Sequence, residues 1–186
     1  DGMFVQPIHG KGVRVIWLKG ETDMLGALEE VESFGEFAKR NNAVASTEVK
    51  SFEHLICTEQ LSRRLGFKVG EELIRVVRVR SLNGNARQVD HGYFLESIAK
   101  GLTPEIAAKS IYDYLEHKRG VKVMASRRTV SVELANDEDC SYLDLGKYNC
   151  VAVMESQSYT SDGILFEVTH ARTHPEIFHY RVNSKR

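Results

Sequence analysis

The chain has 186 residues, of which 42% are hydrophobic and 27% charged, and its formal net charge is −1. This balance excludes a disordered chain and is typical of a globular domain with a substantial core. The near-neutral charge argues against a chain that binds a nucleic-acid backbone by itself, because phosphate binding needs a basic surface. No apolar run approaches the ~20 residues that a membrane helix needs. Three scattered cysteines, with Cys57 inside an apolar run, favour reduced thiols and a cytoplasmic protein.

The N-terminal part of the chain predicts short strands followed by one helix. Alternating apolar residues predict strands over Met3–Ile8 and Gly12–Leu18. Apolar residues at spacings of three and four predict a helix from Met24 to Arg40. A further strand is expected over Ser46–Ile56. The chain opens without an initiator methionine, so we expect it to be a fragment of a longer protein.

Two hairpins, with helices between them, account for the remainder of the chain. Asn83-Gly84 and Asp162-Gly163 each lie between apolar runs, which is a strong hairpin signal. Strands that pair through hairpins make an α+β domain with a mostly antiparallel sheet. The expected elements are a short helix from Thr58 to Gly66, strands over Leu73–Leu82 and Arg87–Leu95, a helix that starts at Thr103-Pro104 and that Ser110 caps or continues to Lys118, a strand over Val121–Leu134, a helix from Asn136 to Asp144, strands over Asn149–Tyr159 and Ile164–Thr173, and a last strand over Phe178–Val182.

Arg78 and Arg80 lie two residues apart in an expected strand, so both side chains point to one face of the sheet. Two neighbouring guanidinium groups can bind a carboxylate or a phosphate. The alternative is a solvated face with acids on the neighbouring strand. Ser110 and Tyr112 lie at an expected helix start, where backbone N–H groups and a hydroxyl favour an anion, although capping is the commoner role of such a serine.

Asp90 and Glu167 each follow a hairpin turn and could accept hydrogen bonds from sugar hydroxyls or an amine. Two carboxylates also allow a glycosidase, whereas most single acids are surface or salt-bridge groups. His170, His174 and His179 resemble a metal site only superficially, because the HExxH pattern is absent. We therefore expect no metal and no cofactor.

Seven short motifs follow one another over about four-fifths of the chain. They are Ser33-Phe34, Leu65-Gly66-Phe67 with Gly70, Arg75 to Arg80 followed by Asn83-Gly84, Val89 to Phe94, Ser110 to Leu115, Asp162-Gly163 followed by Phe166-Glu167, and Phe178 to Tyr180. In this order they resemble the UTRA ligand-sensing domain of GntR-type bacterial transcription regulators of the HutC group.

The resemblance implies a chorismate lyase-like fold, with a mostly antiparallel sheet flanked by helices and an effector pocket beside the sheet. Residues 1–22 would be the end of the wing and the linker from an absent N-terminal winged helix-turn-helix domain, and residues 23–186 the UTRA domain. It also implies a cytoplasmic homodimer that is not an enzyme. This dimer would sense a small anionic metabolite, a sugar phosphate, and would contact DNA through the absent domain and no membrane.

The same resemblance carries over a set of effector-binding residues. Two positions depart from the family pattern: Asp90 stands where many relatives have glutamate, and Thr173 where a tyrosine often follows the acid. The implied effector-binding residues are Arg78, Arg80, Ser110, Tyr112, Glu167, Asp90 and Ser33.

Two alternatives stay open at this point. A small enzyme of the same fold could act on a carboxylate substrate with Arg78, Arg80 and Glu167 around it. The departures at Asp90 and Thr173 would also suit a dimerisation module whose pocket has degenerated.

Overall fold

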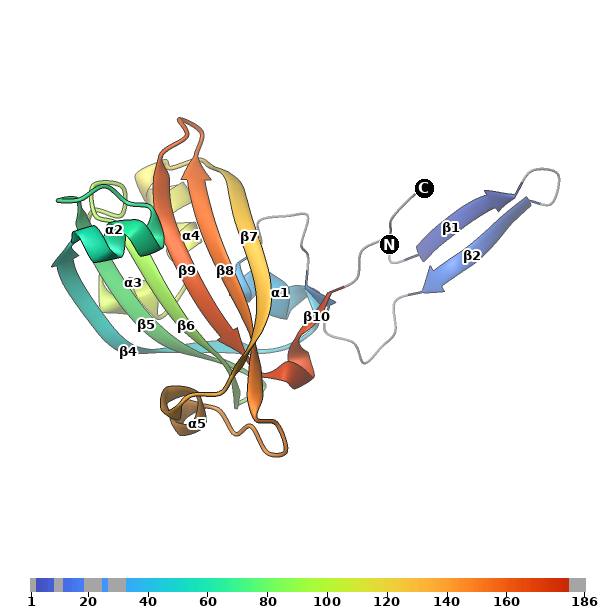
Figure 1. The fold of residues 1–186 in the computed structure, drawn as a ribbon. Coiled ribbons are helices and arrows are strands. Elements are labelled where there is room, and N and C mark those ends of the chain that lie inside the picture. The colour runs from blue at the N-terminus through green and yellow to red at the C-terminus, as the bar shows by residue number, and fades with distance from the viewer. Residues whose placement is uncertain (1–2, 9–11, 19–24, 27–32, 181–186) are drawn as a thin grey trace.

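The computed structural model describes residues 3–8, 12–18, 25–26 and 33–180 (Figure 1). β1 (Met3–Ile8) and β2 (Gly12–Leu18) pair in an antiparallel two-stranded sheet, which confirms both predicted strands. A second small sheet joins β3 (Leu25–Gly26) in parallel to β10 (His179–Tyr180). The last strand is therefore confirmed at residues 179–180, while residues 181–182 lie outside the described part.

The helix expected from Met24 to Arg40 is wrong in its first half. Residues 25–26 are strand, residues 24 and 27–32 are not described, and α1 spans only Phe34–Arg40. Ser33 and Glu36 form a capping box that begins the helix at this point, because each side chain accepts the backbone N–H of the other residue. The apolar spacing could not reveal this boundary, since it continues through the cap.

The main domain is built on a six-stranded antiparallel sheet, which confirms the predicted fold class. The two predicted hairpins lie next to each other, so that β6 pairs with β9 at the centre of the sheet. The strand order is β4 (Ala45–Ile56), β5 (Glu72–Leu82), β6 (Asn85–Leu95), β9 (Leu165–Thr173), β8 (Cys150–Thr160) and β7 (Val123–Leu134).

Short helices cover both faces of this sheet, with α2 on one face and α3 and α4 on the other (Figure 1). The helix expected from Thr103 to Lys118 is broken after Ala107, and Ser110 caps a new turn. The helical segments are α2 (Glu59–Leu65), α3 (Pro104–Ala107), α4 (Ile111–Asp113), the π-helical turn η1 (Tyr114–Lys118), α5 (Asp137–Tyr142) and the 3-10 turn η2 (Pro175–Ile177). Within the described ranges, no helix is long and apolar enough to span a membrane.

The apolar core lies mainly at one end of the sheet, where α2, α3 and α4 meet the strands. Leu73, Phe94 and Phe166 are fully buried there, together with Leu115 from η1. A smaller cluster packs β5, β6 and β8 against the segment that follows α5. Between the helices, the middle of each sheet face is left to polar side chains.

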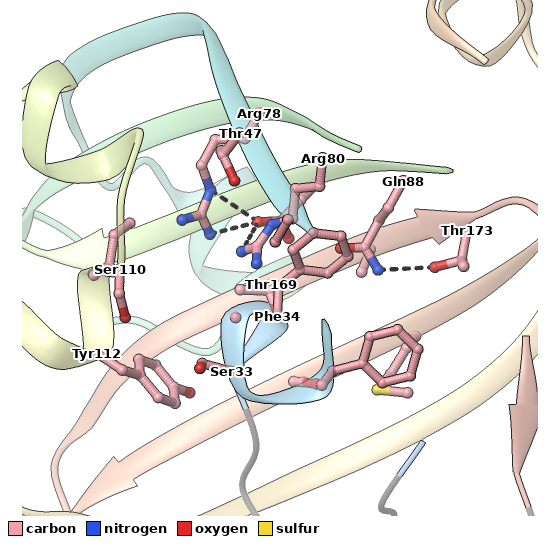
Figure 2. A pocket seen from close by; sticks show the side chains of 18 of the residues that line it. Ser33, Phe34, Thr47, Arg78, Arg80, Gln88, Ser110, Tyr112, Thr169 and Thr173 are labelled. Carbon is pink, nitrogen blue, oxygen red and sulfur yellow. Dashed lines mark hydrogen bonds and ion pairs between the residues drawn. The ribbon is translucent and has the colours of Figure 1, made fainter. Parts of the chain in front are cut away.

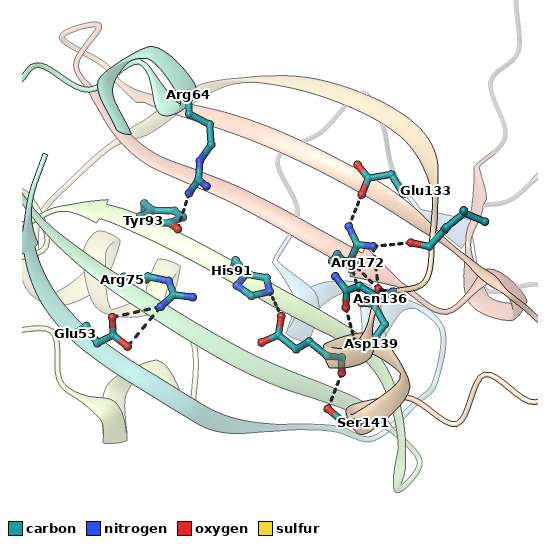
Figure 3. A network of polar contacts seen from close by, with 12 residues as sticks. Glu53, Arg64, Arg75, His91, Tyr93, Glu133, Asn136, Asp139, Ser141 and Arg172 are labelled. Carbon is teal, nitrogen blue, oxygen red and sulfur yellow. Dashed lines mark hydrogen bonds and ion pairs between the residues drawn. The ribbon is translucent and has the colours of Figure 1, made fainter. Parts of the chain in front are cut away.

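A buried ion pair attaches α5 to the sheet. The carboxylate of Asp139 has no solvent exposure and accepts two N–H groups of Arg172, from Nε and from Nη2, each at 2.9 Å (Figure 3). The same carboxylate accepts the backbone N–H of Asn136 and so completes the helix cap. Arg172 also pairs with Glu133 on β7.

We expect Asp139→Ala to lower the free energy of unfolding by about 3–5 kcal/mol, because it leaves the Arg172 guanidinium buried with weaker compensation. Urea unfolding at neutral pH measures the change. Asp137→Ala is the matched control, since Asp137 is exposed in the same helical turn and should cost less than about 1 kcal/mol. Equal losses in the two variants would show that the ion pair does not anchor α5.

Candidate functional site

A cavity of about 480 Å³ lies on the sheet face that α1 and α4 cover. Around it, Figure 2 shows Arg78 and Arg80 from β5, Phe34 from α1, Tyr112 from α4, and the N-cap residues of these two helices, Ser33 and Ser110. All seven residues singled out from the sequence line this one cavity, namely Ser33, Arg78, Arg80, Asp90, Ser110, Tyr112 and Glu167. The structure thus brings the whole predicted set together.

The strand register explains why residues so distant in sequence meet. Alternate residues of each strand share a face, and Arg78 of β5 lies directly opposite Asp90 of β6. β6 in turn pairs with β9, which places Glu167 on the same face two strands from Arg78. The central pairing of the two hairpins therefore assembles the site.

Asp90 is shared by both arginines. Its Oδ2 accepts Arg78 Nε at 3.0 Å, Arg78 Nη2 at 2.5 Å and Arg80 Nη2 at 2.8 Å. Arg78 is 3% and Asp90 2% exposed. The sequence left open a solvated sheet face with acids on the neighbouring strand. The acid on the neighbouring strand is confirmed, but Arg78 and Asp90 are buried and not solvated.

The electrostatics of this cluster favour an ionised carboxylate. Burial alone would raise the pKa of Asp90, but the charges and hydrogen bonds of Arg80 and Arg78 outweigh it and lower the pKa to about 2. Burial and the neighbouring Arg80 charge lower the pKa of Arg78, and Asp90 opposes that shift. One carboxylate therefore compensates two guanidinium groups only in part.

Both arginines line the cavity, and within the described ranges each has an N–H group without a good acceptor. Among the described residues, the buried Nε of Arg80 has no hydrogen-bond partner, and its guanidinium lies 5.1 Å from the ring centre of Phe34. The Nη1 of Arg78 has only a 3.5 Å contact with the carbonyl of Ala107. Buried donors without good acceptors are costly, so this end of the cavity favours an anion.

Both serines cap helices, a role that the sequence left as an alternative for Ser110 only. Ser110 Oγ accepts the backbone N–H of Asp113 at 3.1 Å, and Ser33 Oγ accepts that of Glu36 at 3.3 Å. A hydroxyl that accepts in this way still carries a proton to donate. Each serine can therefore cap its helix and donate into the cavity at the same time.

The other end of the cavity holds a tyrosine–glutamate pair. Tyr112 donates its phenol to Glu167 Oε2 at 2.5 Å, and its oxygen lies 3.0 Å from Ser158 Oγ. Burial raises the pKa of Glu167, and burial together with Glu167 raises the pKa of Tyr112 well above its ordinary value. Glu167 offers acceptors to a hydroxyl or amine at this end.

Several residues that line the cavity were not predicted from the sequence. Gln88 donates to Thr173 Oγ1 at 2.9 Å, so Thr173 fills its position with a hydroxyl that is already engaged. Thr47 on β4 and Arg128 on β7 also line the cavity. Their place on the cavity face follows from the strand register, which a single sequence does not contain.

The histidines near the C-terminus do not converge. His174 is buried beside the carbonyl of Asp144, and His170 lies on the opposite sheet face between Glu133 and Glu155. Among the described residues, no group of three or more histidine, cysteine or acidic side chains could hold a metal ion. Asp90, fixed as an anion by two arginines, is also unsuited to donate a proton as a glycosidase acid would.

Comparisons with known proteins agree with this geometry. Residues 40–179 match the UTRA domain family. The HTH-type transcriptional regulator TreR of Bacillus subtilis is 27% identical over 95% of this chain and 73% of its own length, and the repressor NagR of the same organism is 22% identical over 89% and 66%.

Solved structures show the same fold. The effector binding domain of the B. subtilis trehalose repressor (TreR) superposes with a TM-score of 0.67 at 27% identity, covering 76% of this chain and 98% of that domain. The possible regulator YydK of B. subtilis reaches a TM-score of 0.77 at 22% identity, covering 97% of this chain and 76% of its own.

The low pKa of Asp90 predicts an acid-labile domain. The folded state holds this proton less tightly than the unfolded chain does, so stability is complete above the ordinary pKa of 3.8 and is lost as pH falls toward 2. The loss should reach about 2 kcal/mol, from a shift of nearly two pH units. Carbon-13 NMR titration of the Asp90 carboxyl checks this directly. A midpoint near pH 3.8 would contradict the shared ion pair.

Proposed function

The chain belongs to the UTRA domain family, as an effector-binding domain of a GntR-family transcription regulator, and from that premise we propose that it binds a sugar phosphate in the cavity between α1, α4 and the sheet. The relatives found by sequence are regulators, so the domain acts by binding and not by catalysis. The enzyme alternative is therefore set aside.

The observation that carries the proposal is the charge balance at Arg78 and Arg80. The buried Arg78 and the part-buried Arg80 share one carboxylate, and within the described part of the chain the Arg80 Nε has no hydrogen-bond partner. A phosphate group could accept from both arginines and from the hydroxyls of Ser110 and Ser33, which line the same cavity. An uncharged ligand would leave the second guanidinium charge uncompensated.

The opposite end of the cavity suits the sugar. Glu167 and Tyr112 line this part of the cavity and provide oxygens that hydroxyl groups can donate to. The cavity volume of about 480 Å³ falls within the range of roughly 300–1,000 Å³ that small-molecule sites have. That one relative is a trehalose repressor supports a sugar-derived effector.

We further propose that the protein is a cytoplasmic homodimer of the HutC group and that it binds DNA through a winged helix-turn-helix domain preceding this chain. Residues 1–22 would then be the end of the wing and the linker, and residues 23–186 the sensor. An effector can shift such a dimer between two arrangements only through different affinities for them, typically by 1–3 kcal/mol of coupling. Because α1 supplies Ser33 and Phe34 to the cavity, a bound effector would contact the helix that follows the linker.

A dimerisation module without an effector is the second candidate. Asp90 already engages both arginines, and this internal pairing would suit a pocket that no longer binds anions. The two candidates differ in whether any anion stabilises the domain.

We expect sugar phosphates, and not the corresponding free sugars, to raise the melting temperature of the domain. A ligand at a hundred times its dissociation constant stabilises by about 2.7 kcal/mol, which a thermal-shift assay detects readily. Arg80→Met should abolish the shift, because it removes one of the two guanidinium groups of β5 that line the cavity.

Arg75→Met is the matched control, since Arg75 lies on the same strand but lines the opposite sheet face and pairs with Glu53. It should leave the sugar-phosphate shift intact. A shift caused by free sugars alone, or one that survives Arg80→Met, would contradict the assignment of the anion site. No shift from any of these ligands would favour the dimerisation module.

A further inference from the structure

A second cavity, of about 590 Å³, lies on the sheet face opposite the cavity that Arg78 and Arg80 line. Alternate residues of β6 serve the two cavities, because Asp90 lines the first and Tyr93 lines the second. The second cavity lies between α2 and α5, over the central strands of the sheet (Figure 3). It is therefore a concave site separate from the one proposed for the sugar phosphate.

Most basic side chains of the second cavity already face a carboxylate. Of the six that line it, four lie within ion-pair distance of an acid. These pairs are Arg75 with Glu53, Arg172 with Asp139, His91 with Glu138, and His170 with Glu155. Within the described part of the chain, the other two, Arg64 and Arg127, pair with no carboxylate.

Arg64 is exposed, yet its guanidinium group is held in place at the cavity. Its Nη2 donates to the hydroxyl of Tyr93 at 2.7 Å, and its Cζ lies 5.5 Å from the centre of the same ring (Figure 3). A phenol is uncharged, so this contact positions the guanidinium without compensating its charge. The remaining N–H donors of Arg64 are thus preorganised for an anion.

Arg127 lies at the other end of a row that crosses the floor of the cavity. It is opposite Gln157 on β8, which is opposite Val168 on β9, which is opposite Tyr93 on β6. Three strand spacings of about 4.8 Å place the backbones of Arg127 and Tyr93 about 14 Å apart. Since Tyr93 holds Arg64, the two uncompensated charges suit two separate anionic groups better than one.

We propose that this second cavity binds an elongated organic dianion with a carboxylate at each end, one held by Arg64 and the other by Arg127. A carboxylate matches a guanidinium group in geometry and brings one negative charge to it. A phosphate group carries more than one negative charge, and Glu138 and Glu155 already line this cavity. Repulsion from these acids favours carboxylates, so the ligand differs in class from the proposed sugar phosphate.

An NMR titration of the whole chain with suberate, a straight-chain diacid, tests the assignment. Suberate should shift the backbone signals of Tyr93 and Gln157, on the floor of the cavity. It should bind about tenfold more tightly than octanoate, which has the same chain length but only one carboxylate, because a second charged contact is lost. Succinate is too short to reach both arginines and should bind as weakly as octanoate.

Arg64→Gln and Arg127→Gln should each weaken suberate binding about tenfold. Both side chains are exposed, so the melting temperature without ligand should stay unchanged and show that the variants fold. Arg63→Gln is the matched control, because Arg63 precedes Arg64 on the same helix and pairs with Glu59. It should leave the dissociation constant of suberate unchanged.

Arg80→Met separates the two cavities. Suberate binding that this variant leaves intact, and that Arg64→Gln weakens, supports the second site whatever the sugar phosphates do. Suberate binding that Arg80→Met abolishes and Arg64→Gln does not change would place the diacid in the other cavity and overturn the proposal. Equal affinities for suberate and octanoate, or no binding of suberate, would overturn it as well.

Discussion

The buried carboxylate of Asp90, held between Arg78 and Arg80, is the interaction on which the site depends. Its pKa of about 2 shows that attraction to the two guanidinium groups outweighs the cost of burying the charge. The arrangement holds both arginines in place without a ligand, and it sets one carboxylate between two guanidinium groups. Preorganised donors lower the cost of binding an anion, because few side chains must be ordered.

The order of the strands determines where the charged side chains lie on the cavity face of the sheet. Because the two hairpins pair through β6 and β9, the arginine cluster lies on one side of the central strands and the Glu167–Tyr112 pair lies on the other. The short helices α1 and α4 close the cavity above both ends. The fold thereby places the guanidinium groups of β5 and the carboxylate of Glu167 on β9 around one cavity.

The sequence could predict whatever depends on local periodicity or on a motif. The spacing of two residues within an expected strand predicted that Arg78 and Arg80 share one face of the sheet. The Asn-Gly and Asp-Gly turns predicted the positions of both hairpins. Convergence of Asp90 and Glu167 with these arginines depends on the β6–β9 pairing. The resemblance to UTRA domains implied one shared site, but nothing in the sequence predicted this pairing. The helix start at Ser33 was missed because the apolar spacing runs through the cap, and the Gln88–Thr173 contact was missed because strand register is not local.

NMR of the arginine side chains tests the central claim most directly, since the claim is that an anion contacts Arg78 and Arg80. In a titration with glucose 6-phosphate, chosen as a representative sugar phosphate, the Nε–Hε signal of Arg80 should move to the position of a hydrogen-bonded guanidinium, with a smaller change at Arg78. The signal of Arg75, on the other face of the same strand, should stay in place. Changes at Arg75 with none at Arg80 would place the anion on the wrong side of the sheet and contradict the account.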